Sequence, residues 1–244
     1  MAGDGLMGAE TGRLRYASFL TLLIGCALLL SARLVYLYLS DAQRFPISKV
    51  KITANYQHVT RKQIESVLSG YTTASFFSLP VRQLQQDFLA LDWSDHVYIA
   101  RVWPDTLQLT LVEKTPVAVW NDALMTEDGE VFNVGKGAVE TTLPRLSGPE
   151  QQQTDVLQIY QKLSKLLSVY GLHAASLQLR DNQAWEMSLT NGIQLHLGKR
   201  DLEKRLLRFC RAYPAVFADK PEQLSSVDLR YARGMAVQWK GSSK

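Results

Sequence analysis

A long apolar stretch near the N-terminus constrains the fold more than any other feature. Residues 17–39 read ASFLTLLIGCALLLSARLVYLYL. With Tyr16 this makes 24 mostly apolar residues, enough for a helix to cross a bilayer. Arg33 lies near the outer end, where its guanidinium can reach the headgroups. The sequence therefore predicts a transmembrane helix over residues 16–39, after a cytoplasmic tail over residues 1–15.

A cleaved signal peptide is the alternative interpretation of this stretch. The apolar core of a signal peptide spans about 7–15 residues, and a small-residue cleavage site follows it. The stretch here is longer and no A-x-A site follows, so we expect an uncleaved anchor. Basic residues stand on both sides, so their count alone does not set the orientation. The short N-terminal part and the long C-terminal part favour a cytoplasmic N-terminus, since long domains translocate largely regardless of charge.

The remaining sequence has the composition of folded protein. Hydrophobic residues make up 46% of the chain and charged residues 20%. The net charge is +4 without a long basic block, so nucleic-acid binding is not predicted. Of the two cysteines, Cys26 lies in the apolar stretch and Cys210 in a distant helical pattern, which makes a mutual disulfide implausible. We expect Cys210 to be a small apolar core residue.

Residues 46–115 carry the pattern of a small α+β domain. Alternating apolar residues predict strands, and a 3.6-residue period predicts helices. The resulting order is strand 49–54, helix 61–69 capped by Thr60, a second helix from Pro80, strand 96–103, a turn at Pro104-Asp105 and strand 106–112. In the second helix, one face is formed by Leu84, Phe88 and Leu91. In the last strand, Leu107, Leu109 and Leu111 face one way, and Thr106, Gln108 and Thr110 face the other way. Phe76 and Phe77 are expected to be buried aromatics. Two helices on one face of a three-stranded sheet would satisfy this order.

Residues 116–240 predict a β-rich domain with two helices. The expected strands are 117–120, 123–126, 130–133, 174–180, 184–189, 193–197, 227–231 and 235–239, and the expected helices are 154–170 and one capped by Asp201 whose face is formed by Leu202, Leu206, Phe209, Tyr213 and Val216. Residues 135–148 are expected to form a loop. The last strand would lie at an exposed edge of the sheet.

The sequence offers little for catalysis. The four histidines, His58, His96, His173 and His196, lack metal-ligand spacing, and neither G-x-S-x-G nor S-x-x-K occurs. Residues 135–137 (GKG) lack the ending of a phosphate-binding loop. Asp92 and Asp95 flank Trp93 at a helix end, where they more simply cap and solvate a loop. We therefore predict no enzyme, no catalytic or metal-binding residue, no cofactor, and a protein that acts by binding other proteins.

The end of the chain is the candidate binding surface. An edge strand over residues 235–239 would leave backbone groups free to pair with a partner strand. Arg230, Tyr231 and Trp239 are residue types that dominate binding hot spots. The alternative is that Tyr231 and Trp239 pack in the core, and spacing alone favours it.

Several segments point to a known family. They are residues 101–120 (RVWPDTLQLTLVEKTPVAVW), 143–149 (LPRLSGP), 185–197 with its Asn-Gly turn, 197–200 (LGKR), 205–209 (RLLRF) and 227–239 (VDLRYARGMAVQW). In this collinear set, and in the position of its anchor, the chain resembles the FtsQ/DivIB family of bacterial cell-division proteins. Arg233 departs from the family pattern at a turn position that is usually small or acidic, and Ala74 stands where a glycine is common.

The resemblance implies a function. It implies a POTRA domain over residues 46–115, a partner-binding β domain over residues 116–240, and an essential scaffold at the division septum of the inner membrane, with its C-terminal part periplasmic. It implies binding of FtsB and FtsL, with the FtsB strand added to the last strand, control of septal peptidoglycan synthesis, and recruitment through the POTRA domain by FtsK and other divisome proteins. The residues carried over to partner binding are Arg230, Tyr231, Gly234, Val237 and Trp239.

Two other functions are weighed against this one. A POTRA-type chaperone or secretion component would carry a downstream membrane β-barrel, for which we expect no room in this chain. A membrane-tethered cell-wall enzyme would need a nucleophile or a metal cluster, and the sequence shows neither pattern.

Overall fold

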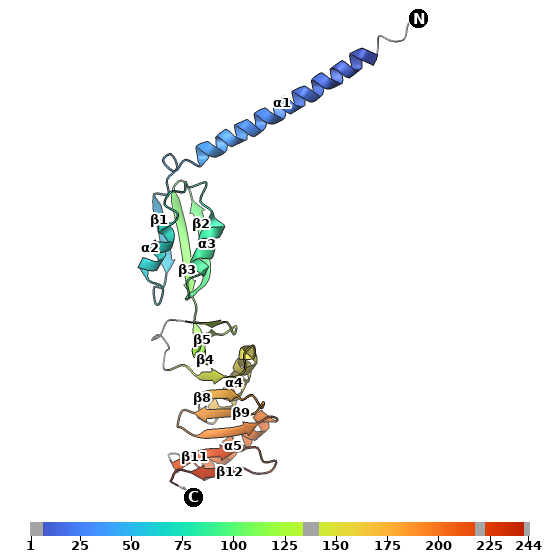
Figure 1. Cartoon of the computed structure of the whole chain (residues 1–244). Helices are drawn as coiled ribbons and strands as arrows, with labels where there is room; N and C mark the ends of the chain where they lie inside the picture. Colours follow the sequence, from blue (N-terminus) through green and yellow to red (C-terminus); the bar gives the residue numbers. More distant parts are fainter. Residues whose placement is uncertain (1–6, 134–141, 218–222, 242–244) are drawn as a thin grey trace. The chain divides into compact units, whose positions relative to one another are not determined.

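The computed structural model describes residues 7–133, 142–217 and 223–241. The chain divides into two compact units, Met1–Glu113 and Lys114–Lys244, which we describe separately (Figure 1).

The first unit begins with a long helix, α1, over Met7–Leu39. Its segment Phe19–Leu39 has a mean hydropathy of 2.1, and none of it is buried within the protein. Such a helix is long and apolar enough to cross a membrane once. The helix begins nine residues before the expected start at Tyr16, so part of the predicted tail is helical.

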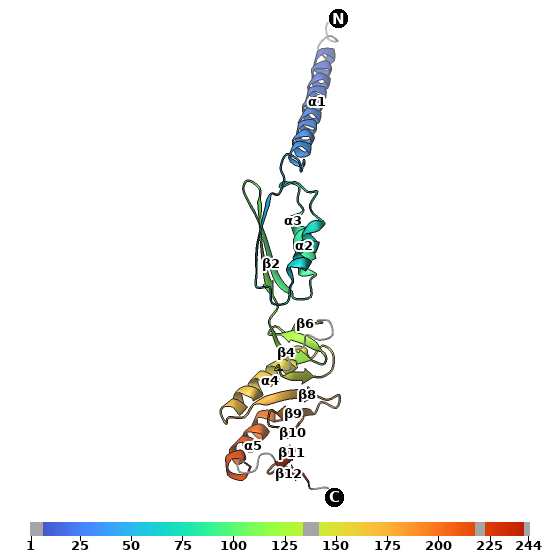
Figure 2. The ribbon, with the colours of Figure 1, turned by 90° about the vertical axis from the view of Figure 1, so that its left-hand side faces the viewer.

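The rest of the first unit has the predicted order of elements. These are β1 (Lys49–Ala54), α2 (Arg61–Ser69), α3 (Val81–Leu89), β2 (Ser94–Val102) and β3 (Thr106–Glu113). The sheet order is β1-β3-β2, with β1 parallel and β2 antiparallel to β3. Both helices cover one face of this sheet (Figure 2). The predicted α+β unit is therefore confirmed.

Local sequence signals explain these elements. Thr60 forms a capping box with Gln63: its side chain accepts from the Gln63 main-chain N–H at 3.3 Å, and the Gln63 side chain accepts from the Thr60 N–H at 2.8 Å. On β3, alternate leucines face the helices and are buried. They pack with Ile64, Leu84 and Phe88 in one apolar core.

Three details of this unit differ from expectation. Phe76 is buried, but Phe77 is only half-buried, and one of the rings that it contacts edge-on is the exposed Trp103. Leu91 lies beyond the end of α3, which stops at Leu89. Thr106 is buried rather than outward-facing; its hydroxyl donates to the Asp105 side chain at the hairpin turn.

The second unit is built on one mixed sheet. Among the described residues its strands are β4 (Pro116–Trp120), β5 (Ala123–Thr126), β6 (Val131–Phe132), β7 (Arg145–Ser147), β8 (Ala174–Leu179), β9 (Trp185–Leu189), β10 (Gln194–Gly198), β11 (Leu224–Asp228) and β12 (Ala236–Trp239). Their order is β12-β11-β10-β9-β8-β7-β4-β5-β6. The predicted β-rich unit with an exposed C-terminal edge strand is confirmed.

Two helices, α4 (Gln153–Ser168) and α5 (Leu202–Val216), pack beside each other on one face of this sheet (Figure 2). Their apolar sides join the sheet in a single core. Cys210 is fully buried there, as predicted, and burial raises the pKa of its thiol to about 11. The thiol therefore stays protonated at neutral pH.

The second unit corrects four predictions. The strand expected over residues 227–231 is β11, which ends at Asp228, so Arg230 and Tyr231 lie beyond it. The expected loop 135–148 contains β7, which is only three residues long; residues 134–141, including the GKG segment, lie outside the described residues. Asp201 precedes α5, but its side chain makes no capping hydrogen bond: the backbone is left-handed (φ 56°), and the carboxylate lies 3.5 Å from the Lys204 ammonium. Val216 is 59% exposed, since it stands where the helix ends and turns away from the core.

Candidate functional site

Strand β12 forms one edge of the second sheet. It pairs antiparallel with β11, with Trp239 opposite Leu224 and Val237 opposite Val227. In the part of the chain that the structure describes, no strand lies on the outer side of β12. An edge strand presents main-chain N–H and C=O groups that are available to a partner strand. The site is therefore a place where a sheet can be extended.

The predicted site residues surround this edge with different degrees of exposure. Tyr231 is 58% exposed, so it does not belong to the core. Trp239 is 37% exposed, and the other part of its ring faces Phe217, with centroids 6.1 Å apart. Val237 is half-buried against the core, whereas Gly234 is exposed with open space around it. The surface thus combines the exposed ring of Tyr231 with the ring of Trp239, which packs against Phe217 on its inner side.

Arg230 is exposed and held by Asp228. Its Nε lies 2.9 Å from Oδ1, and its Nη2 lies 2.6 Å from Oδ2. This two-pronged pair is the favourable geometry for guanidinium and carboxylate. The hydrogen bond from Arg230 lowers the pKa of Asp228 below its ordinary value, against a smaller opposing effect of burial. Arg230 therefore has a fixed position beside the start of the turn that leads to β12.

Arg208, on α5, fixes that turn and was missed by sequence reasoning. Its guanidinium donates to the main-chain oxygens of Leu229, Tyr231 and Ala232 at 2.9–3.0 Å. Among the described residues, its buried Nε has no hydrogen-bond partner. No short motif signals this role, because the acceptors are main-chain atoms more than 20 residues away. Arg208 connects the helix layer to the candidate binding edge.

Two of the histidines, His58 and His196, contact glutamate side chains. His58 contacts the buried Glu113 at 3.2 Å and stacks on Trp93, while His196 contacts Glu186 at 3.2 Å. Over residues 7–133, 142–217 and 223–241, no three His, Cys, Asp or Glu side chains are placed to hold a metal ion.

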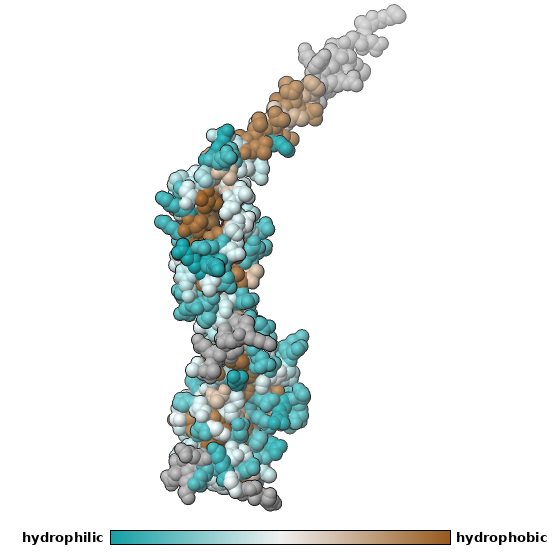
Figure 3. Space-filling view, turned by 60° about the vertical axis from the view of Figure 1, so that its left-hand side comes forward, coloured by the Kyte–Doolittle hydropathy of each residue, from teal (hydrophilic) through white to brown (hydrophobic). Residues whose placement is uncertain are grey.

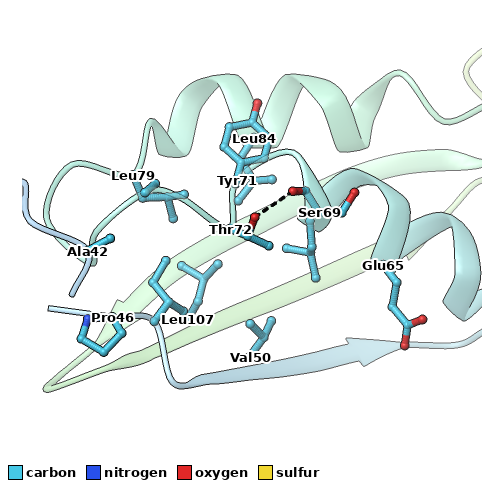
Figure 4. A pocket seen from close by; sticks show the side chains of 13 residues that line it. Ala42, Pro46, Val50, Glu65, Ser69, Tyr71, Thr72, Leu79, Leu84 and Leu107 are labelled. Carbon is cyan, nitrogen blue, oxygen red and sulfur yellow. Dashed lines mark hydrogen bonds between the residues drawn. The ribbon is translucent and has the colours of Figure 1, made fainter.

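The first unit contains a separate apolar pocket of about 370 Å³. Figure 4 shows Val50, Leu79, Leu84 and Leu107 around it, with Glu65 at one side. An apolar area, coloured brown, interrupts the hydrophilic surface of this unit in Figure 3. The pocket adjoins β1, which pairs with β3 on one side. It is a second concave surface, in the other unit from the β12 edge.

These features together define a class: a protein with one apolar N-terminal helix, a POTRA domain and a separate mixed-sheet domain that ends in a free edge strand. The comparisons with known proteins agree with this class. Residues 45–114 match the model of the POTRA domain of FtsQ type, and residues 118–230 match the model of the cell division protein FtsQ/DivIB C-terminal domain.

Whole-chain relatives give the particular family. The chain is 37% identical to cell division protein FtsQ of Shewanella oneidensis over 91% of this chain and 84% of that protein. It is 35% identical to FtsQ of Vibrio cholerae over 87% and 83%, and 33% identical to FtsQ of Escherichia coli over 92% and 84%. The chain belongs to the FtsQ/DivIB family, and the resemblance seen in the sequence is confirmed. It is a cell-division protein, and its apolar helix fits a single pass through the inner membrane.

Proposed function

We propose that the chain is an essential divisome scaffold that binds FtsB and FtsL at the free edge of β12. The supporting observation is that Tyr231 and Trp239 flank an edge strand with an unpaired outer side. A partner strand would pair with the main chain of β12 while its side chains contact the two rings. Through this complex the chain would help control septal peptidoglycan synthesis.

The site is prepared for binding before a partner arrives. Arg208 holds the turn between β11 and β12, and Phe217 supports the ring of Trp239. A surface that is already ordered loses less conformational entropy on binding. Hot spots of this kind are aromatic or arginine side chains within a ring of weaker contacts.

Calorimetry with the full chain in lipid nanodiscs and a soluble FtsB segment tests this proposal. Tyr231→Ala and Trp239→Ala should each weaken binding by about 2 kcal/mol or more, as truncations of hot-spot residues do. Tyr98→Ala is the matched control, because Tyr98 is 60% exposed on β2 of the other unit. Circular dichroism must show that each variant is folded. Unchanged binding by both folded variants would place the FtsB site elsewhere.

The proposal includes a topology. The N-terminus is cytoplasmic, and both folded units are periplasmic at the septum. Protease added to intact spheroplasts should digest the folded units and leave α1 protected. Survival of the POTRA domain under conditions that digest a periplasmic control protein would reverse this orientation.

The POTRA domain is proposed to meet other division proteins such as FtsK. Its apolar pocket supports this, because the side chains that dominate binding between proteins pack into well-desolvated pockets of the partner. Val50 is 39% exposed at the pocket, so Val50→Asp should impair septal localisation of a fluorescent fusion while FtsB binding is retained. Normal localisation would exclude the pocket from recruitment.

We propose that the chain acts by binding, without catalysis. Membership in the FtsQ/DivIB family favours this function over a POTRA-type chaperone or secretion component. Depletion of the protein in cells distinguishes the two functions. Loss of a division scaffold should give filamentous cells with normal export of envelope proteins. Loss of a secretion component should first give defective export.

A further inference from the structure

A cluster of aromatic rings lies at the end of the POTRA domain where the chain leaves α1. Successive ring centroids are 5.1–5.7 Å apart, mostly with edge-to-face geometry, which is the favoured arrangement of aromatic pairs. The members come from the helix end, the linker, the loop before α3 and the tip of the β2–β3 hairpin. They are Tyr38, Phe45, Phe76, Phe77 and Trp103.

Hydrogen bonds fasten this aromatic cluster to the end of the apolar helix. The hydroxyl of Ser75 donates to the main-chain oxygen of Leu39, the last residue of α1, at 2.8 Å. The N–H of Phe76 donates to the Phe45 oxygen at 2.8 Å, and the N–H of Ser48 donates to the Asp105 oxygen at 3.0 Å. The hairpin tip is thus linked to the same place in the chain at which the apolar span Phe19–Leu39 ends.

The aromatic cluster is poorly shielded from its surroundings. Trp103 is 69% exposed and Tyr38 is 53% exposed, while Phe77 is half-buried. A contiguous patch of exposed apolar rings on a folded domain marks a surface for binding to a protein or a membrane, whereas a single exposed ring does not. Tryptophan and tyrosine favour the interface between membrane and water, where the ring is apolar and the polar group stays hydrated.

Cationic groups border the rings. The guanidinium of Arg44 lies 4.7 Å from the Tyr38 ring centre and pairs with Asp41 at 3.1 Å. Arg101 is exposed and donates to the Leu79 oxygen at 2.7 Å. Asp105 is an acidic group at the hairpin tip, and its side chain accepts from Thr106. Arginine beside aromatic rings suits the phosphate groups of lipids.

We propose that this end of the POTRA domain lies in the lipid headgroup region, with the Trp103 ring inserted at the membrane interface. Lipid is the occupant because the cluster includes Tyr38 of the apolar helix itself and is hydrogen-bonded to the helix end. A bilayer that surrounds Leu39 therefore reaches the cluster without any partner protein. The inference depends on α1 crossing the membrane and is independent of FtsB binding at β12.

Tryptophan fluorescence of the full chain in vesicles of pure phosphatidylcholine tests the proposal. Vesicles made with lipid brominated near the headgroup should quench Trp103, which is one of five tryptophans. Wild type and Trp239→Phe should show this quenching. Trp103→Phe should lose the part of the lipid quenching that comes from Trp103. Phenylalanine keeps an aromatic ring in the cluster, so the fold is expected to remain.

Two outcomes would overturn the proposal. One is equal lipid quenching in wild type and folded Trp103→Phe. The other is a Trp103 signal quenched by aqueous acrylamide and not by brominated lipid, which would indicate a surface for water or for a protein absent from the vesicles. Flotation of the chain with the vesicles must accompany each measurement, so that failed insertion of α1 is recognised separately.

Discussion

The guanidinium of Arg208 donates a hydrogen bond to the main-chain oxygen of Tyr231, 2.9 Å away. This bond joins helix α5 to the turn that precedes β12. The exposed ring of Tyr231 therefore projects from a backbone that is held in place from behind. Side chains that bind partners are more effective when their backbone is fixed before binding.

Replacing Arg208 should weaken partner binding without removing any surface contact. Arg208→Lys keeps the positive charge but cannot reach three carbonyl oxygens at once. We expect a loss of about 1–3 kcal/mol in unfolding free energy, chiefly the cost of the Leu229 oxygen left without a donor, because Leu229 is buried whereas Tyr231 and Ala232 are exposed. Denaturant unfolding and FtsB calorimetry measure the two effects. Arg211→Lys, at an exposed position on the same helix, is the control. Equal behaviour of the two variants would contradict the role of Arg208.

A pair of glycine variants separates crowding from backbone strain. Gly198 and Gly192 both have left-handed backbones, with φ of +77° and +87°. A Cβ on Gly198 would lie 2.5 Å from the Arg205 Nη1 and 3.0 Å from the Arg230 Cγ, whereas a Cβ on Gly192 meets nothing within 4 Å. Gly198→Ala should therefore destabilise the domain more than Gly192→Ala, which carries only the strain of about 1–2 kcal/mol. Thermal unfolding of both variants measures the two losses of stability. Equal losses in Gly198→Ala and Gly192→Ala would show that the side chains of Arg205 and Arg230 move aside freely.

We expect the side chain of Glu113 to contribute strongly to the stability of the POTRA domain. Its buried carboxylate accepts from the main-chain N–H groups of Gln57, His58 and Val59 at 2.9–3.2 Å. Glu113→Gln replaces one acceptor oxygen by a donor and should cost about 1–3 kcal/mol in unfolding free energy.

Glu65→Gln is the matched control for that variant. Glu65 is exposed in the same unit and pairs with Arg61 on the helix surface, where such pairs contribute little. Similar unfolding midpoints for the two variants would mean that the loop over residues 57–59 does not depend on the Glu113 carboxylate.

The pair of Asp228 and Arg230 predicts an acid-dependent component of stability. The folded pKa of Asp228 is lowered, chiefly by the hydrogen bond from Arg230. A carboxyl whose pKa is lower in the folded state stabilises the fold above its unfolded pKa and loses this contribution as pH falls through its folded pKa. Asp228→Asn should therefore reduce stability at pH 7 and have a smaller effect well below pH 3.8, the ordinary value. Unfolding midpoints across this range measure the difference, and a constant difference at all pH values would refute it.

Elements with strong local signals could be predicted closely. The strands Lys49–Ala54 and Ala123–Thr126 and the helix Arg61–Ser69 have the predicted bounds. Alternation of apolar residues and the Thr60–Gln63 capping box depend on neighbours in the sequence, so they can be recognised without the fold.

Elements that depend on distant partners could not. Strand β7 has three residues, too few for a period, and exists because β4 and β8 pair with it on both sides. The exposure of Tyr231 and the support of Trp239 by Phe217 follow from tertiary packing alone. The same holds for Arg208, whose hydrogen bonds end on main-chain oxygens that no side-chain pattern reveals.

The parallel pairing of β1 with β3 has a mechanical consequence. The chain enters the POTRA sheet at Lys49, opposite Thr106, and leaves it at Glu113, at the other end of β3. A tension applied between the membrane helix and the chain beyond Glu113 would pull these two strands past each other along their length. The main-chain hydrogen bonds between β1 and β3, over a register from Lys49–Thr106 to Ala54–Leu111, would then bear the load together instead of opening one after another. The domain is thus a tether that resists stretching along the six paired residues of β1 and β3, about 20 Å at about 3.3 Å per residue.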